Sequence, residues 1–140
     1  MKVLLLICVL ALTACTKESE ELRMRVQQSI PVPATMSQVL NRGILYPTAG
    51  IQVTGVVRVV QLSSGKQLQI DSFSITPGPD LKVYLSQNAL PGNHLNLGNL
   101  ISNNGHQAYN IPANTNLSAY NYVLIHCQQF NHLFSYGKLQ

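Results

Sequence analysis

A β-branched stretch at residues 51–62 constrains the fold of this chain more than any other feature. It reads IQVTGVVRVVQL, and its valines alternate with other residues. A period of two is typical of a strand with one buried face. The turn signal SSGK (63–66) separates it from a second such stretch, QLQIDSFSI (67–75). The pair predicts a β-hairpin in which Leu68 and Ile70 share one face, and Phe73 and Ile75 lie on the other.

More short stretches of strand character follow, and no long helix is predicted. LKVYLS (81–86), AYNYVLIHCQQF (119–130) and HLFSYGKL (132–139) are separated by segments rich in Asn, Gly and Pro. The stretch TPGPD (76–80) predicts a turn built on Gly78, Pro79 and Asp80. Spacing of this kind favours a sandwich or a barrel. We expect an all-β fold, a single antiparallel β-sandwich of seven to nine short strands over residues 44–140.

The N-terminus has the pattern of a secretion signal. Lys2 precedes an apolar run, residues 3–12, which is too short to cross a bilayer but suits the core of a signal peptide. LTAC at 12–15 resembles the lipobox of bacterial lipoproteins, which implies cleavage after Ala14 and attachment of acyl chains such as palmitate to Cys15. We expect a signal peptide at 1–14 and anchorage in the cell envelope, at the outer membrane. The alternative is an ordinary secretory signal that happens to contain Cys15.

Residues 15–43 are expected to be a lipid-anchored linker. TKESEELRMR (16–25) is charged, IPVPAT (30–35) contains two prolines, and SQVLNRG (37–43) suggests one helical turn ended by Gly43. From Ile44 onward there are four basic residues and two acidic ones, Asp71 and Asp80. That charge is too dilute to follow a phosphate backbone, so nucleic acid is not an expected partner.

The expected processing leaves Cys127 as the only free thiol. Cys8 departs with the signal and Cys15 becomes a thioether, so no disulfide forms within the chain. In an extended strand Val123, Ile125 and Cys127 share one face, and His126 points to the other. We expect a partly buried thiol near a pocket mouth, with His126 outside. Because apolar burial makes a thiol inert, core packing remains an alternative role for Cys127.

Several segments together resemble one family, the electron-transfer DM-thirteen domain. They are SGKQLQIDSF (64–73), GPDLKVYLS (78–86), LGNLISNNGHQAYNIP (97–112) and YNYVLIHCQQFNHLFSYGKL (120–139). The resemblance implies an extracytoplasmic β-sandwich whose cysteine, here Cys127, acts in redox chemistry as a bare thiol or by holding a prosthetic group. Two departures stand out. His126 replaces the family's usual tryptophan, and Ser135 and Tyr136 separate Phe134 from Gly137.

Other chemistry has little support in the sequence. His126, Cys127 and His132 are weak candidates for a metal site, with His94 and His106 expected in loops, because their spacing matches no zinc motif. No haem-attachment or other cofactor motif is present. Two acidic residues and no nucleophile elbow give no basis for a hydrolase, so the protein is more simply read as non-enzymatic.

Two functions therefore remain. The first is electron transfer or redox sensing through Cys127, together with an envelope redox protein. The second is a module that binds a surface protein or a glycan, with Cys127 structural. Five tyrosines would supply a sugar-stacking patch in the second case; they are Tyr84, Tyr109, Tyr120, Tyr122 and Tyr136.

Overall fold

The expected hairpin is the centre of the fold. In the computed structural model, which describes residues 37–140, β3 (Val53–Leu62) and β4 (Gly65–Ile75) pair in antiparallel register around the 63–64 turn. β1 (Gln38–Ile44) and β7 (Asn104–Ile111) complete a four-stranded sheet in the order β1-β3-β4-β7. We call this sheet A.

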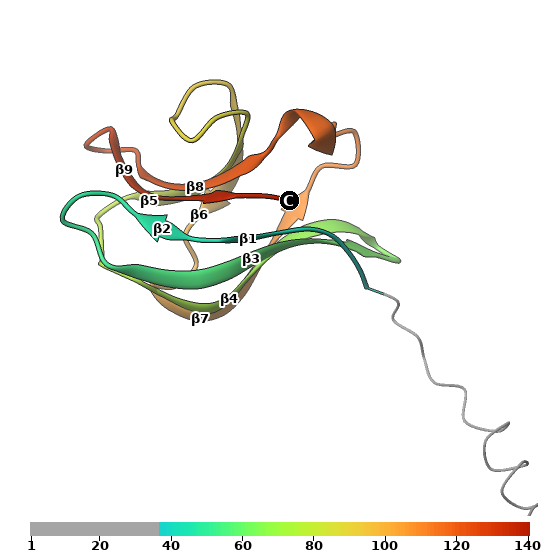
Figure 1. Ribbon diagram of the computed structural model, residues 1–140, viewed down its shortest axis with the longest axis horizontal. Helices are drawn as coiled ribbons and strands as arrows, with labels where there is room; N and C mark the ends of the chain where they lie inside the picture. Colours follow the sequence, from blue (N-terminus) through green and yellow to red (C-terminus); the bar gives the residue numbers. More distant parts are fainter. Residues whose placement is uncertain (1–36) are drawn as a thin grey trace, which may run out of the picture. The chain divides into compact units, whose positions relative to one another are not determined.

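The second sheet, sheet B, has five strands in the order β2-β9-β8-β5-β6. They are β2 (Tyr46–Pro47), β5 (Leu81–Ser86), β6 (His94–Asn99), β8 (Tyr122–Cys127) and β9 (His132–Lys138). The two sheets form the layers seen in Figure 1. The prediction of an all-β antiparallel sandwich is confirmed, and the strand count is nine. Among the described residues the helical structure is a 3-10 turn at Leu117–Ala119, and none of their helices could span a membrane.

The first strand lies where a helical turn was expected. Residues 38–44 pair with β3, so the helical prediction for SQVLNRG was wrong. Six of the seven residues of this strand lie before residue 44, where the sequence analysis placed the start of the domain. The pairing is non-local, which local helix signals do not reveal. The signal peptide, Cys15 and the linker up to residue 36 lie outside the described residues.

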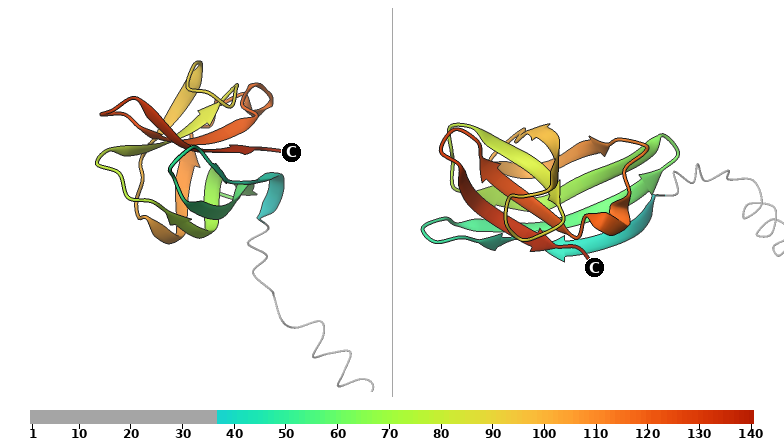
Figure 2. Two further views of the ribbon diagram at one scale, coloured as in Figure 1. Left: turned by 60° about the vertical axis from the view of Figure 1, so that its left-hand side comes forward. Right: turned by 90° about the horizontal axis from the view of Figure 1, so that it is seen from above.

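β1 also joins the two sheets along one side. Arg42 and Gln140 exchange two backbone hydrogen bonds of 2.9 Å, and the chain then passes through buried Leu45 into β2 of sheet B. The C-terminal end therefore lies beside β1 in every view (Figures 1 and 2). Gly43 permits this approach, because a Cβ there would lie 2.3 Å from the Lys138 carbonyl oxygen.

A β-bulge changes the predicted faces of β4. Leu68 and Ile70 face the core as predicted, but Phe73 and Ile75 are buried in the same core and not on the opposite face. The register shifts after Ile70, where Ser72 has a φ of +50°. One extra residue in a bulge reverses the facing of everything that follows. Gly55, on the paired strand β3, leaves room for the Phe73 ring, because a Cβ at residue 55 would lie 3.2 Å from that ring.

Candidate functional site

Cys127 is the last residue of β8, a strand flanked on both sides by others in sheet B. Its side chain is 0% exposed and belongs to the core between the sheets, as do Val123 and Ile125. The predicted facing of these three residues is confirmed. The expectation of a partly open thiol was wrong, because the core closes fully over this end of the strand.

The residues that carried the family resemblance meet around this thiol. Leu81 is the cross-strand partner of Cys127, and the Gln128 N–H donates a 2.9 Å hydrogen bond to the Asp80 carbonyl. Gly78 lies under the Phe134 ring, which a Cβ at 78 would approach to 2.9 Å. The 78–80 turn, the end of β8 and Phe134 of β9 thus form one packed unit, here called the Cys127 end.

His132 forms the outer rim of the Cys127 end. It is the cross-strand partner of Cys127 on β9 and is exposed. Its ring meets Phe134 edge-on, with centroids 5.4 Å apart. A register shift between Ile125 and His126 adds one residue to β9 at this point. Phe134, the added residue, is buried in the core.

His126 points away from the thiol, as predicted, but it is buried. Only 4% of it is exposed, so the expectation of a solvent-facing imidazole was wrong. Its ring lies 5.6 Å from Tyr84, which in turn stacks on His94 with centroids 4.1 Å apart. Tyr84 and His94 belong to β5 and β6, so the sequence around His126 does not predict these contacts. A signal existed in LKVYLS, where alternation places Tyr84 on the face opposite Val83.

The surroundings of the buried His126 ring disfavour its protonation. Its Nδ1 has no hydrogen-bond partner, and its cross-strand neighbour is Lys82. Burial lowers the pKa of His126, and charges on His94 and His132 lower it further, against an opposing effect of Asn131. These surroundings favour the neutral form of the imidazole.

The donor set around Cys127 does not fit a metal or a prosthetic group. Within residues 37–140, no three His, Cys, Asp or Glu side chains are grouped to hold a metal ion. His126 points to the opposite side of the sheet, and the thiol lies among apolar side chains. His94 and His106, expected in loops, lie on β6 and β7.

The two acidic residues of the domain lie in separate ion pairs. Asp71, on sheet A, binds the Arg58 guanidinium and lies 2.5 Å from the His106 ring. Burial raises the pKa of Asp71, but the hydrogen bonds from His106 and Arg58 outweigh it and leave that pKa lowered. Asp80, in the turn before β5, lies 2.7 Å from Lys82. The carboxylates do not converge on one site.

The tyrosines do not form one patch either. Tyr109 is buried in the core and Tyr120 packs against it. Tyr136 and Tyr84 are both cross-strand partners of Leu124, which places them on the outer face of sheet B. Tyr122 has the same facing, two residues before Leu124.

The fold and the Cys127 end define an all-β sandwich with a closed thiol beside a Gly-Pro-Asp turn. The model of the family Electron transfer DM13 matches residues 48–139. The chain belongs to that family. No curated protein and no solved structure matches it.

Proposed function

We propose that this is a lipid-anchored protein of the bacterial cell envelope whose domain takes part in electron transfer through Cys127. The observation that carries the proposal is the family match over residues 48–139, since the family is an electron-transfer family. The expected lipobox cysteine, Cys15, supplies the anchor, and an envelope redox protein is the partner.

Burial sets a condition on this chemistry. A thiol reacts as the thiolate and needs an open, polar environment, whereas Cys127 is fully enclosed. The Cys127 end must therefore open before the thiol reacts. Cys127 lies at a strand terminus, next to the turn at 128–131. Local openings that leave the rest of a fold intact concentrate at such places.

The redox step itself needs a partner's sulfur, because the mature chain has no second free thiol. The Cys127 thiolate attacks one sulfur of the partner's disulfide. A bond forms between the two sulfurs, the partner's disulfide breaks, and its other sulfur leaves as a thiolate. Cys127 is oxidised to the mixed disulfide while the partner takes up the electron pair.

The direct test is to trap this mixed disulfide. Cells are quenched in acid, free thiols are blocked with an alkylating reagent, and the protein is isolated without reductant. The expected product is a reducible adduct on Cys127 that Cys127→Ser abolishes. An entirely alkylated Cys127 under oxidising growth conditions would reject the redox role.

A second candidate is favoured by the complete burial of Cys127. In it the domain is a binding module for a surface protein or a glycan, and Cys127 only fills the core. The trapping experiment separates the two, because a structural thiol forms no adduct.

The anchor has its own test. Metabolic labelling with palmitate should mark the protein, and Cys15→Ser should abolish the label and let a high-salt wash release the protein from membranes. A label that persists in Cys15→Ser would refute the lipobox assignment.

A further inference from the structure

Exposed apolar side chains gather on β1 and at the start of β2. Seven large apolar residues of the described part are exposed, and four of them lie within residues 39–46. These four are Val39, Leu40, Ile44 and Tyr46. Scattered single residues of this kind are ordinary, whereas a cluster marks an interaction surface.

Cross-strand register places most of this cluster on one continuous outer surface. Val39, Arg42 and Ile44 lie opposite Val60, Arg58 and Val56, which alternate with the core residues Val57 and Val59 and so mark the outer face of sheet A. Tyr46 lies opposite Tyr136, on the outer face of sheet B. Because β1 joins the two sheets, their outer faces meet along this strand.

Unpaired cations lie on the same surface. Both acidic residues of the described part are already engaged, by Arg58, His106 and Lys82. Within residues 37–140, the basic side chains that form no ion pair are Arg42, Lys66 and Lys138. Arg42 and Lys138 line one surface depression of about 360 Å³. The other residues that line it are Gly43, Ile44, Tyr46 and Gln140.

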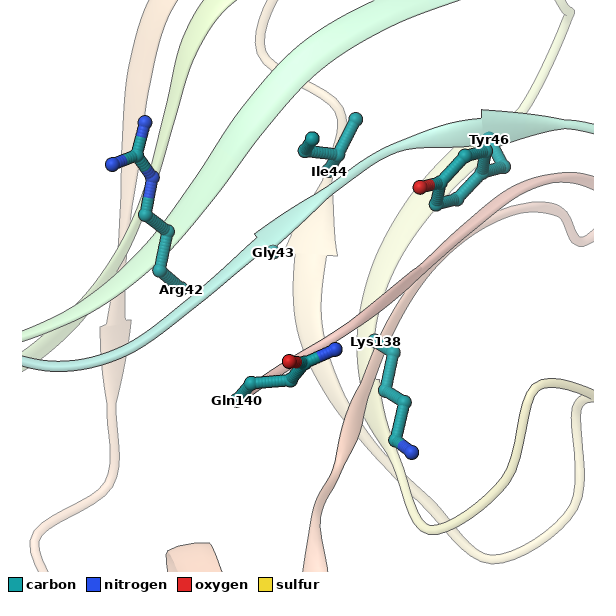
Figure 3. Close-up of a pocket in the computed structure, with 6 residues that line it drawn as sticks. All are labelled: Arg42, Gly43, Ile44, Tyr46, Lys138 and Gln140. Atoms are coloured by element: carbon teal, nitrogen blue, oxygen red, sulfur yellow. The ribbon is translucent and has the colours of Figure 1, made fainter.

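The directions of these side chains argue against a single bound anion. Figure 3 shows Arg42 and Lys138 extending away from each other on either side of β1 and the C-terminal segment, with Tyr46 at one end. A clamp for one phosphate or carboxylate needs converging donors. Diverging cations around exposed apolar side chains match a broad surface of headgroups above an acyl layer.

We propose that this surface, formed by Val39, Arg42, Ile44, Tyr46 and Lys138, rests on a phospholipid bilayer that contains anionic lipids. Tyrosine favours the membrane interface, and each basic residue near an anionic surface contributes about 1 kcal/mol. The strand β1, which carries Val39, Arg42 and Ile44, begins 23 positions after Cys15. The proposal rests on the proposed anchor only in that the anchor would hold β1 near the bilayer.

The test uses the chain from residue 15 onward with Cys15→Ser, so that no acyl chain contributes. Partition is measured by sedimentation with vesicles of phosphatidylethanolamine and phosphatidylglycerol, and with vesicles of phosphatidylcholine alone. We expect preference for the anionic vesicles, a loss of about fivefold for Arg42→Gln or Lys138→Gln, and about 25-fold for both. Lys66→Gln, which removes an unpaired cation elsewhere, should change partition less than about twofold.

The apolar contribution has a matched control as well. Ile44→Ser should weaken partition several-fold, whereas Ile101→Ser, at a position that is somewhat more exposed, should leave it unchanged. The proposal is overturned if the unsubstituted chain does not partition, or if Lys66→Gln and Ile101→Ser lose as much as the β1 variants. Saturable binding of inorganic phosphate at the depression, abolished by the same two charge variants, would overturn it in favour of a single-anion site. Because this chain carries no lipid, these results do not depend on whether the anchor or the redox role is correct.

Discussion

Cys127 and His126 are neighbours in β8 that point into different layers of the protein. The thiol is enclosed between the two sheets, and the imidazole is covered on the outer face of sheet B by Tyr84. The residue at the position where the resemblance implies a tryptophan is therefore a buried histidine on the far side of the sheet from the thiol. It does not act on the thiol directly, and its effects should appear in stability.

The first prediction concerns the space that the thiol fills. Cys127→Ala should lower the free energy of unfolding by about 1–2 kcal/mol, as expected for a small buried loss. Cys127→Ser should cost more, since a buried hydroxyl without a partner adds roughly 1–3 kcal/mol. Urea denaturation followed by circular dichroism measures both. Equal stabilities for Ser and Ala would mean that the site is hydrated.

The second prediction concerns the glycine under Phe134. A Cβ at residue 78 would lie 2.8 Å from a Leu81 methyl carbon and 2.9 Å from the Phe134 ring. Gly78→Ala should therefore destabilise the domain by roughly 1–3 kcal/mol through overpacking. Gly92→Ala is the matched control, because nothing lies within 4 Å of a Cβ there. If the two variants have the same denaturation midpoint, the packing of Phe134 on residue 78 is wrong.

The third prediction is a pH dependence caused by His126. Its pKa is lowered in the folded state from the ordinary value of 6.5, so the unfolded chain binds the proton more readily. The contribution of this site to stability is complete above pH 6.5 and is lost as the pH falls through 6.5 toward the lowered folded pKa. His126→Phe should flatten the stability profile across that window.

The control for this profile is His132→Gln. His132 is exposed, and its charge is the smallest of the causes that lower the His126 pKa, so its loss should leave most of the decline in place. Thermal melts from pH 7.5 down to about pH 4.5 would give both profiles. Asp71 has a lowered pKa from an ordinary 3.8, so its contribution is lost only below about that pH and does not confuse the comparison. An unchanged slope in His126→Phe would assign the dependence elsewhere.

The sequence predicted those features that depend on local alternation. The β3–β4 hairpin and the shared facing of Val123 and Cys127 follow from a period of two. The predictions that were wrong concern features that depend on residues far away in the sequence. β1 is a strand because β3 pairs with it, and Phe73 turns inward because a bulge shifts the register after Ile70. His126 is buried because β5 and β6 supply its cover.

Residues of the Cys127 end were singled out from the sequence, but neither their proximity nor the closure of the thiol was predicted. Gly78, Asp80 and Cys127 were singled out as motif residues, and the structure brings them together. Whether the thiol is open depends on Phe134 and on the core, whose closure is a property of packing in three dimensions. Spacing along the chain does not encode that closure.

The central claim is that Cys127 is closed in the native fold and becomes reactive only through local opening of the Cys127 end. The most direct measurement is the rate at which Ellman's reagent labels the Cys15→Ser chain, from residue 15 onward, in increasing low concentrations of urea. We predict labelling at least about a thousandfold slower than in the unfolded chain, at a rate that hardly changes with urea, because a local opening exposes little surface. Labelling as fast as in the unfolded chain would contradict the closed thiol. A rate that rises with the full urea dependence of global unfolding would contradict local opening and leave Cys127 a structural residue.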